Sequence, residues 1–183
     1  SITTAVAFCR DGSAAGMVTN PIQKATLYED GFRYPGHTEF LASLASVDQG
    51  GPIMMLASDE LRVVPLTIHV PVKDLANSIS KQSIVTAAKL LDVSLKRFFG
   101  LSAPRIAIAG LNPHAGENGN IGREDKDIIL PAITDLQQSG LRVTGPFPAD
   151  TLFHEEARKS YDVVIGMYHD QVLIPLKTIN FFG

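Results

Sequence analysis

The fold is decided by residues 105–147, which read RIAIAGLNPHAGENGNIGREDKDIILPAITDLQQSGLRVTGPF. Residues 105–111 form an apolar run that predicts a buried strand, and residues 141–147 predict a second strand. Between them, residues 125–139 carry apolar side chains at helical spacing, and Gly140 supplies a natural end for a helix. A strand, a helix and a second strand in this order are typical of a parallel sheet with crossover helices.

The same alternation extends to both sides of this segment. A helix is expected over residues 73–99, and a shorter one from Asp150-Thr151 through Arg158. Pro131 falls inside the expected helix of residues 125–139 and should either destabilise it or kink it. We therefore expect an α/β fold with a largely parallel sheet. Further strands are expected at the remaining apolar runs, residues 15–19, 52–58, 61–70, 162–168 and 172–179.

The composition is that of a globular protein, with 183 residues, 45% of them hydrophobic and 19% charged. The formal net charge of −3 gives no reason to expect nucleic acid or an anionic membrane as a partner. No apolar run is long enough to span a bilayer. Cys9 is the only cysteine, which excludes an internal disulfide and fits a cytoplasmic location. The abrupt start at Ser1 and end at Gly183 lead us to expect a fragment of a longer chain.

Three of the five histidines share one position in this pattern. His69, His114 and His169 each lie at or just beyond the carboxyl end of an expected strand, the edge where open parallel sheets gather ligand-binding groups. Neutral imidazole is the commonest metal ligand, and three imidazoles with an open position suit a catalytic zinc. A strand-end histidine taken alone is more often a solvated loop residue, and no short motif links these three. Asp170 could orient His169 through its second ring nitrogen.

A glycine-rich loop precedes the expected helix, with Gly116, Gly119 and Gly122 in a GxxGxxG spacing. Backbone N–H groups between a strand and a helix can bind a phosphate. The loop is neither a GxGxxG fingerprint nor a Walker loop, and an ordinary structural turn explains the same glycines equally well.

Four other polar residues could contact a ligand. His37 and Thr38 suit an anionic or hydroxylated ligand, although the residues alone favour an ordinary helix start with Thr38 as its cap. Lys24 and Lys177 lie near apolar segments and could pair with a phosphate or a carboxylate, or simply extend along apolar surface. His154 has no supporting context and is expected on the surface.

Taken together, these motifs resemble the 4-hydroxythreonine-4-phosphate dehydrogenase family of pyridoxal phosphate biosynthesis. One departure is Val172, where the family often has a glycine after YHDQ. The N-terminal part of the family's chain and its downstream Asn and Arg substrate contacts are also absent. The motifs that carry the resemblance run in order through the chain: PGHTEF (35–40), HVP (69–71), GLNPHAGE (110–117), GPFPADT (145–151) and MYHDQ (167–171).

The resemblance implies an α/β/α architecture related to isocitrate and isopropylmalate dehydrogenases, with the active site in a cleft between two domains. Residues 1–183 would then be the metal- and substrate-binding part of a two-domain dehydrogenase, and no domain boundary is evident within them. The metal site of this family is built across a homodimer interface. Its three ligands map onto His69, His114 and His169.

The reaction implied by the resemblance is metal-assisted, NAD-dependent oxidation and decarboxylation of 4-phosphooxy-threonine to 3-amino-2-oxopropyl phosphate. The family's substrate contacts map onto His37, Thr38 and Lys177. Lys177 could also move a proton, and Asp150, in a strand-end turn, is the candidate catalytic base or hydrogen-bonding partner. The loop from Gly116 to Gly122 is the local candidate for NAD contacts. NADP remains an alternative cofactor; zinc is the expected metal, with cobalt, nickel, magnesium and manganese open.

Three other functions fit the same residues. A paralogue could act on D-threonate or D-erythronate 4-phosphate, because these substrates share the phosphate and the hydroxyl groups. The histidines could instead hold a hydrolytic zinc without nicotinamide, or the chain could bind metal or phosphate without turnover. NADH formation would indicate a dehydrogenase, hydrolysis without NAD a metallohydrolase, and binding without turnover a binding module.

Overall fold

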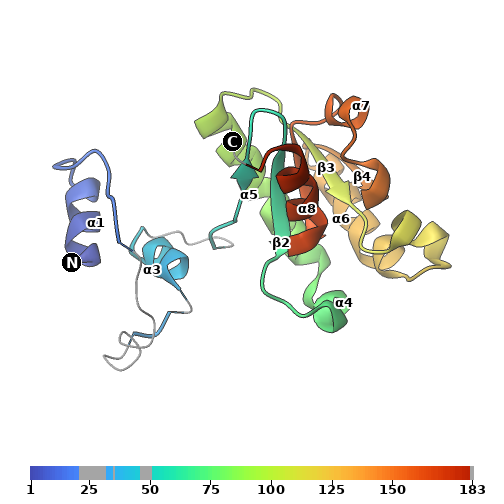
Figure 1. The fold of residues 1–183 in the computed structure, drawn as a ribbon, viewed down its shortest axis with the longest axis horizontal. Coiled ribbons are helices and arrows are strands. Elements are labelled where there is room, and N and C mark those ends of the chain that lie inside the picture. The colour runs from blue at the N-terminus through green and yellow to red at the C-terminus, as the bar shows by residue number, and fades with distance from the viewer. Residues whose placement is uncertain (21–31, 35, 46–50, 182–183) are drawn as a thin grey trace. The chain divides into compact units, whose positions relative to one another are not determined.

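The computed structural model divides into two compact units, Ser1–Pro52 and Ile53–Gly183 (Figure 1). No shift in composition marks this boundary in the sequence. The first unit contains helix α1 (Ile2–Arg10) and helix α3 (His37–Leu44). The Arg10 guanidinium donates a 3.1 Å hydrogen bond to the Leu44 carbonyl, which ties the two helices together. The structure describes residues 1–20, 32–34, 36–45 and 51–181.

A five-stranded sheet forms the centre of the second unit, in the order β1-β2-β5-β3-β4. Strands β2, β5, β3 and β4 run parallel, and β1 pairs with β2 in the antiparallel direction. The buried Thr67 hydroxyl donates to the Met167 carbonyl oxygen at 2.7 Å and so links β2 to β5. The expected α/β fold with a largely parallel sheet is confirmed. The strands are β1 (Leu56–Ala57), β2 (Arg62–Thr67), β3 (Arg105–Ala109), β4 (Arg142–Phe147) and β5 (Val163–Tyr168).

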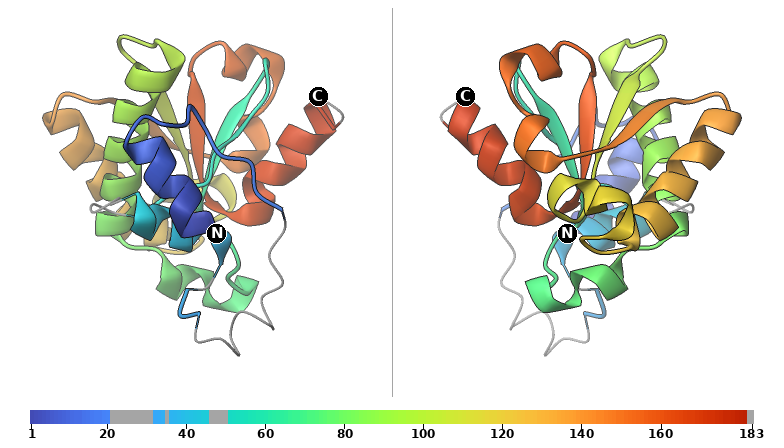
Figure 2. Two further views of the ribbon diagram at one scale, coloured as in Figure 1. Left: turned by 90° about the vertical axis from the view of Figure 1, so that its left-hand side faces the viewer. Right: turned by 90° about the vertical axis from the view of Figure 1, so that its right-hand side faces the viewer.

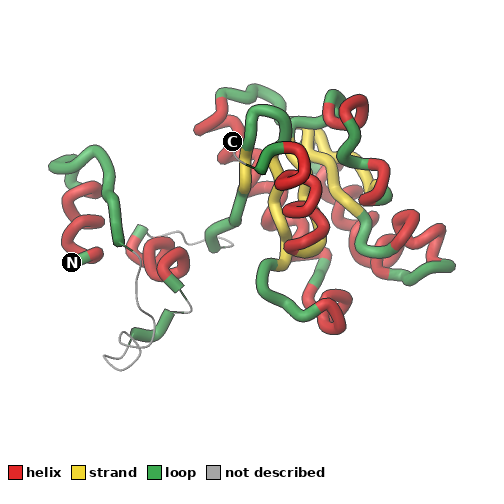
Figure 3. Tube along the Cα trace, viewed as in Figure 1, coloured by secondary structure: helices red, strands yellow, loops and turns green. Residues whose placement is uncertain are grey.

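Helices cover both faces of this sheet (Figures 2 and 3). On one face, α5 and α6 pack their buried Ile, Leu and Ala side chains against Ile106, Ile108 and Ile165. On the other face, α8 packs against β2 and β5 through Val172 and Leu176. These three layers confirm the α/β/α architecture. The helices and helical turns of the second unit are η1 (Val72–Asp74), α4 (Leu75–Ser78), α5 (Lys81–Phe99), η2 (Pro113–Gly119), η3 (Asp125–Ile129), α6 (Leu130–Gln138), η4 (Ala149–Thr151), α7 (Glu155–Arg158) and α8 (His169–Ile179).

The expected helix over residues 73–99 is interrupted before α5. Ser80 is extended, and its hydroxyl accepts a 3.1 Å hydrogen bond from the Ser83 N–H while the Ser83 hydroxyl accepts one from the Ser80 N–H. This capping box starts a new helix at Lys81. Gly100, in the left-handed region at φ 68°, ends it.

The expected helix over residues 125–139 is present, and its first turn is a π-helix. In η3 the Leu130 N–H bonds to the Asp125 carbonyl, five residues back. α6 continues directly from η3, so Pro131 lies inside one helical segment, where it has no N–H to donate to the preceding turn. The perturbation expected at Pro131 therefore takes the form of a widened turn just before it.

Four other secondary-structure predictions are wrong, too long or interrupted. Residues 172–179 lie in α8 rather than in a strand, because the sheet buries Val172, Leu173 and Leu176, which share one helical face. Residues 15–19 form no regular structure, and the strand expected over residues 52–58 shortens to the two residues of β1. The helix expected from Asp150 is split into η4 and α7. Among the described residues, no helix has the length and apolar character needed to cross a membrane.

Candidate functional site

Polar side chains follow all four parallel strands at the edge of the sheet where these strands end. His69 lies two residues beyond β2, and His169 begins α8 directly after β5. Asn112 and His114 follow β3, and Asp150 follows β4 in the turn η4. The prediction that the three histidines lie at the carboxyl edge is therefore confirmed.

His69 and His169 come from neighbouring strands and lie close together. Their ring centroids are 6.2 Å apart, with a 40° angle between the rings. Two imidazoles bound to one tetrahedral zinc would have centroids roughly 5 Å apart, so a shift of about 1 Å would bring this pair into range. The Asp170 carboxylate lies 2.6 Å from His169 Nδ1, as expected for a residue that orients this ring. With Nδ1–H donating to Asp170, Nε2 of His169 has a lone pair for a metal.

The three predicted ligands do not form one cluster among the described residues. In the part of the chain that the structure describes, no three His, Cys, Asp or Glu side chains group closely enough to hold an ion. His114, which is exposed, therefore does not complete a three-ligand group with His69 and His169 in a single chain. The imidazoles of His69 and His169 offer two nitrogen donors of the kind that divalent metals bind.

Three adjoining cavities lie along α8 and the strand ends. The first, of about 380 Å³, brings His114 together with Asp150, Tyr168 and Gln171. The second, of about 490 Å³, shares Asp150, Tyr168 and Gln171 with the first and is otherwise lined mainly by apolar side chains. The third, of about 370 Å³, is lined by His169, Asp170 and Lys177. A concave surface with a few converging polar groups is the usual form of a small-molecule site.

Gln171 joins the ends of β5 and β3. Its Nε2 donates a 2.7 Å hydrogen bond to the Gly110 carbonyl oxygen, and its Oε1 accepts a 2.7 Å bond from the Met167 N–H. We call these two bonds the amide clamp. The sequence signal for it was a glutamine three residues beyond a strand, in the YHDQ motif, to which sequence reasoning assigned no role.

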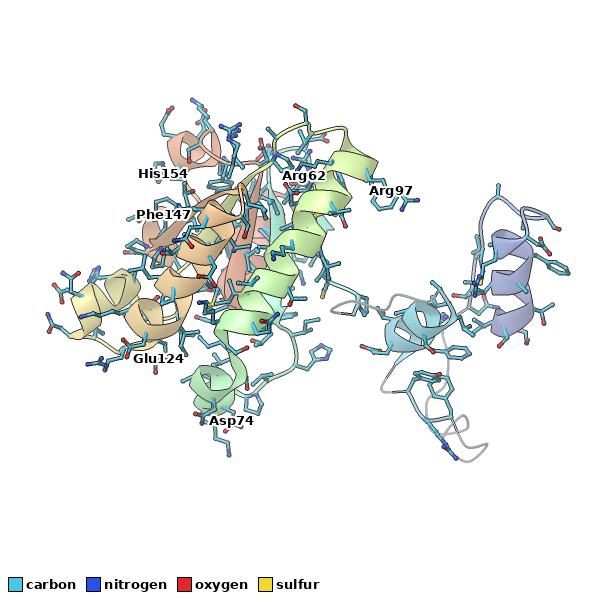
Figure 4. All side chains as sticks on the ribbon, turned by 180° about the vertical axis from the view of Figure 1, so that it is seen from behind. Arg62, Asp74, Arg97, Glu124, Phe147 and His154 are labelled. Atoms are coloured by element: carbon cyan, nitrogen blue, oxygen red, sulfur yellow. The ribbon has the colours of Figure 1, made fainter. Side chains whose placement is uncertain are left out.

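The glycine-rich loop is anchored by a buried carboxylate that sequence reasoning also missed. Asp125 is 1% exposed. Its Oδ1 accepts from the Leu111 N–H at 2.8 Å, and its Oδ2 accepts from the N–H and the side-chain Nδ2 of Asn112 at 3.1 and 2.9 Å. Asn112 Nδ2 also donates to Glu124 Oε2 at 2.8 Å; Figure 4 labels Glu124 at the start of the helical segment formed by η3 and α6. Hydrogen bonds from the Glu124 N–H and from the Asn112 amide hold the pKa of Glu124 below its usual range.

The packing around this anchor explains why Gly116 and Gly122 are glycines. A Cβ at Gly122 would lie 2.4 Å from Asn112 Nδ2. A Cβ at Gly116 would lie 3.0 Å from the Gly122 carbonyl oxygen and 3.2 Å from Asp125. The structure thus gives Gly116 and Gly122 a packing role. The NAD-binding role of Gly116, Gly119 and Gly122 stays a prediction.

His114 lies in a turn of left-handed backbone. Residues 114–118 all have positive φ, between 43° and 76°, and only Gly116 among them is a glycine. Each non-glycine residue in this region costs on the order of 1–2 kcal/mol, so surrounding contacts must hold the turn. The Ala115 N–H bonds to the Asn112 carbonyl at 3.0 Å, and the Ile121 N–H bonds to the Gly116 carbonyl at 3.1 Å. We call residues 114–118 the left-handed turn.

The remaining candidates of the second unit are on the surface. Asp150 and Lys177 are exposed, and Lys177 makes no ion pair with any residue that the structure describes. His154 is exposed as expected, and its Nδ1 caps α7 by accepting from the Ala157 N–H at 3.3 Å.

The first unit holds two of the predicted substrate contacts. His37 and Thr38 are the first two residues of α3. Gly36 is the N-cap of this helix and no side chain caps it, so the interpretation of Thr38 as a cap is wrong. His37 Nε2 is buried and finds no hydrogen-bond partner among the described residues. Lys24 lies outside the described residues.

A mostly parallel sheet between two layers of helices, with histidines, a carboxylate and an amide at its carboxyl edge, defines the class of open α/β proteins that bind small ligands at that edge. The family model described as pyridoxal phosphate biosynthetic protein PdxA matches residues 1–183. The chain belongs to this family, as the resemblance of its motifs indicated.

Named relatives agree with this assignment. The chain is 52% identical over 183 residues to a 4-hydroxythreonine-4-phosphate dehydrogenase of Bradyrhizobium diazoefficiens, covering 99% of the chain and 53% of that protein. It is 48% identical over 186 residues to the enzyme of that name from Caulobacter vibrioides, covering all of the chain and 56% of that protein. The chain thus spans about half the length of these curated relatives.

Solved structures show the same fold. A 4-hydroxythreonine-4-phosphate dehydrogenase from Klebsiella pneumoniae aligns with a TM-score of 0.90 and 40% identity, over 99% of this chain and 54% of that one. A structure described as a terephthalate 1,2-cis-dihydrodiol dehydrogenase from Burkholderia xenovorans aligns with a TM-score of 0.74 and 29% identity, over 97% of this chain and 55% of that one. The fold is therefore the isocitrate/isopropylmalate dehydrogenase-like fold that the resemblance implied.

Proposed function

We propose that this chain forms the metal- and substrate-binding part of a 4-hydroxythreonine-4-phosphate dehydrogenase in pyridoxal phosphate biosynthesis. The observation that carries the proposal is the match along the entire chain to relatives of that name. In the reaction, the hydroxyl carbon β to the carboxylate gives a hydride to NAD and the hydroxyl gives up a proton. The resulting β-keto acid loses CO₂, and protonation of the remaining enol gives 3-amino-2-oxopropyl phosphate.

The three strand-end histidines would hold a divalent metal, zinc in our proposal, with NAD as the second cofactor. Because no three suitable side chains group within the described part of one chain, a second copy in a homodimer would complete the site. The metal, when bound, supplies Lewis acidity to the substrate hydroxyl, which lowers the pKa of the alcohol. A cytoplasmic location belongs to the same proposal.

Two exposed side chains of the cavities would handle the proton and the substrate charge. Asp150 shares the first cavity with His114, so its carboxylate is available to accept the hydroxyl proton. Lys177 shares the third cavity with His169, and its ammonium would bind the phosphate or the carboxylate of the substrate. His37 and Thr38 would add substrate contacts, as the family motif implies.

The test is an activity panel on the full-length protein with NAD and a divalent metal. The substrates are 4-phosphooxy-threonine, D-threonate and D-erythronate 4-phosphates, and a cis-dihydrodiol carboxylate, which the name of the Burkholderia neighbour suggests. We expect NADH and CO₂ to form together, fastest with the amino-acid phosphate. Phosphate release without NAD would reveal a hydrolase and overturn the proposal. NADH formation with a sugar-acid phosphate alone would favour the paralogue.

Two substitutions test the assigned roles. We expect Asp150→Asn to lower kcat by about 10²–10⁴-fold, the usual contribution of a catalytic base. The matched control is Asp59→Asn, which removes an exposed carboxylate from the turn between β1 and β2. Unchanged turnover in Asp150→Asn would rule out the base. Lys177→Met should raise KM for the phosphorylated substrate, and an unchanged KM would remove Lys177 from the binding site.

A further inference from the structure

We infer that Asp125 is a positioning residue that holds His114 in the geometry needed for metal binding. The inference rests on the proposed role of His114 as a metal ligand and adds to it the residue on which that ligand depends. Asp125 lies at the start of η3, eleven residues after His114, and its side chain is almost fully buried.

Asp125 fixes the chain just before His114. Its two carboxylate oxygens accept hydrogen bonds from the Leu111 N–H, the Asn112 N–H and the Asn112 side chain. The carbonyl of Asn112 in turn accepts the Ala115 N–H. The residues on both sides of His114 are therefore tied to the segment that Asp125 anchors.

Asp125 also fixes the chain just after His114. Gly116 is buried, and the space that a Cβ would occupy there is filled by Asp125 and by the Gly122 carbonyl. A Cβ at Gly110, at the end of β3, would lie 2.6 Å from Asp125 Oδ1. The backbone on either side of the left-handed turn thus fits closely around one carboxylate.

The left-handed turn needs such an anchor. L-residues disfavour this backbone region, so residues 114–118 are expected to relax toward ordinary conformations when the anchor is weakened. Relaxation would reorient the His114 imidazole. A change at Asp125 should therefore weaken the binding of a metal that Asp125 does not itself touch.

The chemistry of the anchor requires a carboxylate. The two oxygens of Asp125 receive three N–H donors. An asparagine would present one acceptor oxygen and would turn an NH₂ group toward N–H donors. Asp125 makes no ion pair with any described residue, so the three hydrogen bonds are the polar contacts that hold its side chain.

The experiment measures cobalt binding to the full-length protein by its visible absorption, with the melting temperature of the metal-free protein recorded in parallel. The variants are His114→Ala, Asp125→Asn and the double variant. Asp127→Asn is the matched control, because Asp127 is an exposed carboxylate in the same helical turn, paired with Arg123 at 2.8 Å. Asn112→Ala tests the anchor in a second way if Asp125→Asn does not fold, because it removes only the side-chain bonds to Asp125 and Glu124.

We expect Asp125→Asn to weaken cobalt binding by about 10–100-fold and to alter the cobalt spectrum at temperatures where the variant is fully folded. Asp127→Asn should leave both unchanged, and Asn112→Ala should shift affinity in the same direction as Asp125→Asn. In the His114→Ala background, Asp125→Asn should cause no further loss of affinity, because it acts through His114.

Two results would overturn the inference in distinguishable ways. If His114→Ala weakens binding but neither Asp125→Asn nor Asn112→Ala does, the positioning role fails while the metal assignment stands. If His114→Ala binds cobalt normally, both the positioning role and the proposed ligand are wrong. An undiminished effect of Asp125→Asn in the His114→Ala background would also refute the inference, since Asp125 would then act by another route.

Discussion

Gly166, in the middle of β5, has no room for a side chain. A Cβ at this position would lie 2.2 Å from Val172 Cγ1 and 3.0 Å from Gln171 Oε1. Val172 is fully buried in the first turn of α8, between His169 and the rest of the helix. We expect Gly166→Ala to destabilise the protein by about 1–3 kcal/mol, the usual cost of an extra methyl group in a packed core.

A second substitution should recover part of this loss. Val172→Ala alone removes two buried carbons at about 0.8 kcal/mol each and leaves a small cavity, for a total of about 2 kcal/mol. In Gly166→Ala with Val172→Ala, the new methyl group occupies the space that the valine vacated. The double variant should therefore be more stable than the sum of the single losses predicts, by about 1–2 kcal/mol.

Urea unfolding of the full-length protein, followed by circular dichroism, measures these differences. Val93→Ala, an exposed valine on α5, is the control and should change stability by less than about 0.5 kcal/mol. Strictly additive losses in the double variant would refute the reasoning, because they would show that the two side chains do not compete for one space.

Three further changes test individual contacts. Gln171→Leu removes the amide clamp and should cost about 1–3 kcal/mol in urea unfolding, whereas the exposed Gln138→Leu should cost little. Arg105 hydrogen-bonds the Asp162 carboxylate and holds the pKa of that carboxyl below its usual value. The pair therefore stabilises the protein above the pKa that Asp162 has in the unfolded chain, and this stabilisation is lost as pH falls through its pKa in the folded protein. Asp162→Asn should be less stable than wild type at neutral pH, and the two proteins should become equally stable in unfolding series at acid pH. Burial raises the pKa of Tyr161 to about 12, so the neutral side chain stabilises the protein fully below the unfolded pKa near 10, and this stabilisation is lost as pH rises through about 12. Wild type should therefore lose stability relative to Tyr161→Phe between these two pH values. Equal changes in the unfolding free energy of both proteins over this range would contradict the prediction.

Periodicity in the sequence predicted the parts of the fold that follow local rules. Strands β2, β3, β4 and β5 and the helix after Asp125 coincide with apolar runs of the expected spacing. The segment from Val172 to Ile179 was misassigned because β-branched residues in an apolar run are typical of a strand, and Pro175 disfavours the interior of a helix. The segment is helical because a helix buries one of its faces against the sheet, and the sheet is formed by residues far away in sequence.

The candidate site was predictable to a similar extent. Parallel strands end at one edge, so a histidine after each strand could be placed there from sequence alone. The left-handed turn and the Asp125 anchor could not, because four non-glycine residues adopt that backbone only in response to contacts with a side chain further along the chain. The amide clamp likewise joins atoms 61 residues apart.

The two edge strands of the sheet, β1 and β4, are poorly suited to pairing with a strand of another molecule. At one border, β1 is only two residues long. At the other, β4 contains Pro146, which has no N–H to donate, and the Gln137 side chain donates to the Val143 carbonyl at 2.8 Å. Borders interrupted in this way offer little template for a strand from another molecule, which protects a chain rich in buried parallel strands from edge-to-edge aggregation. Two copies that assemble are accordingly expected to join through helices and loops rather than by continuing the sheet.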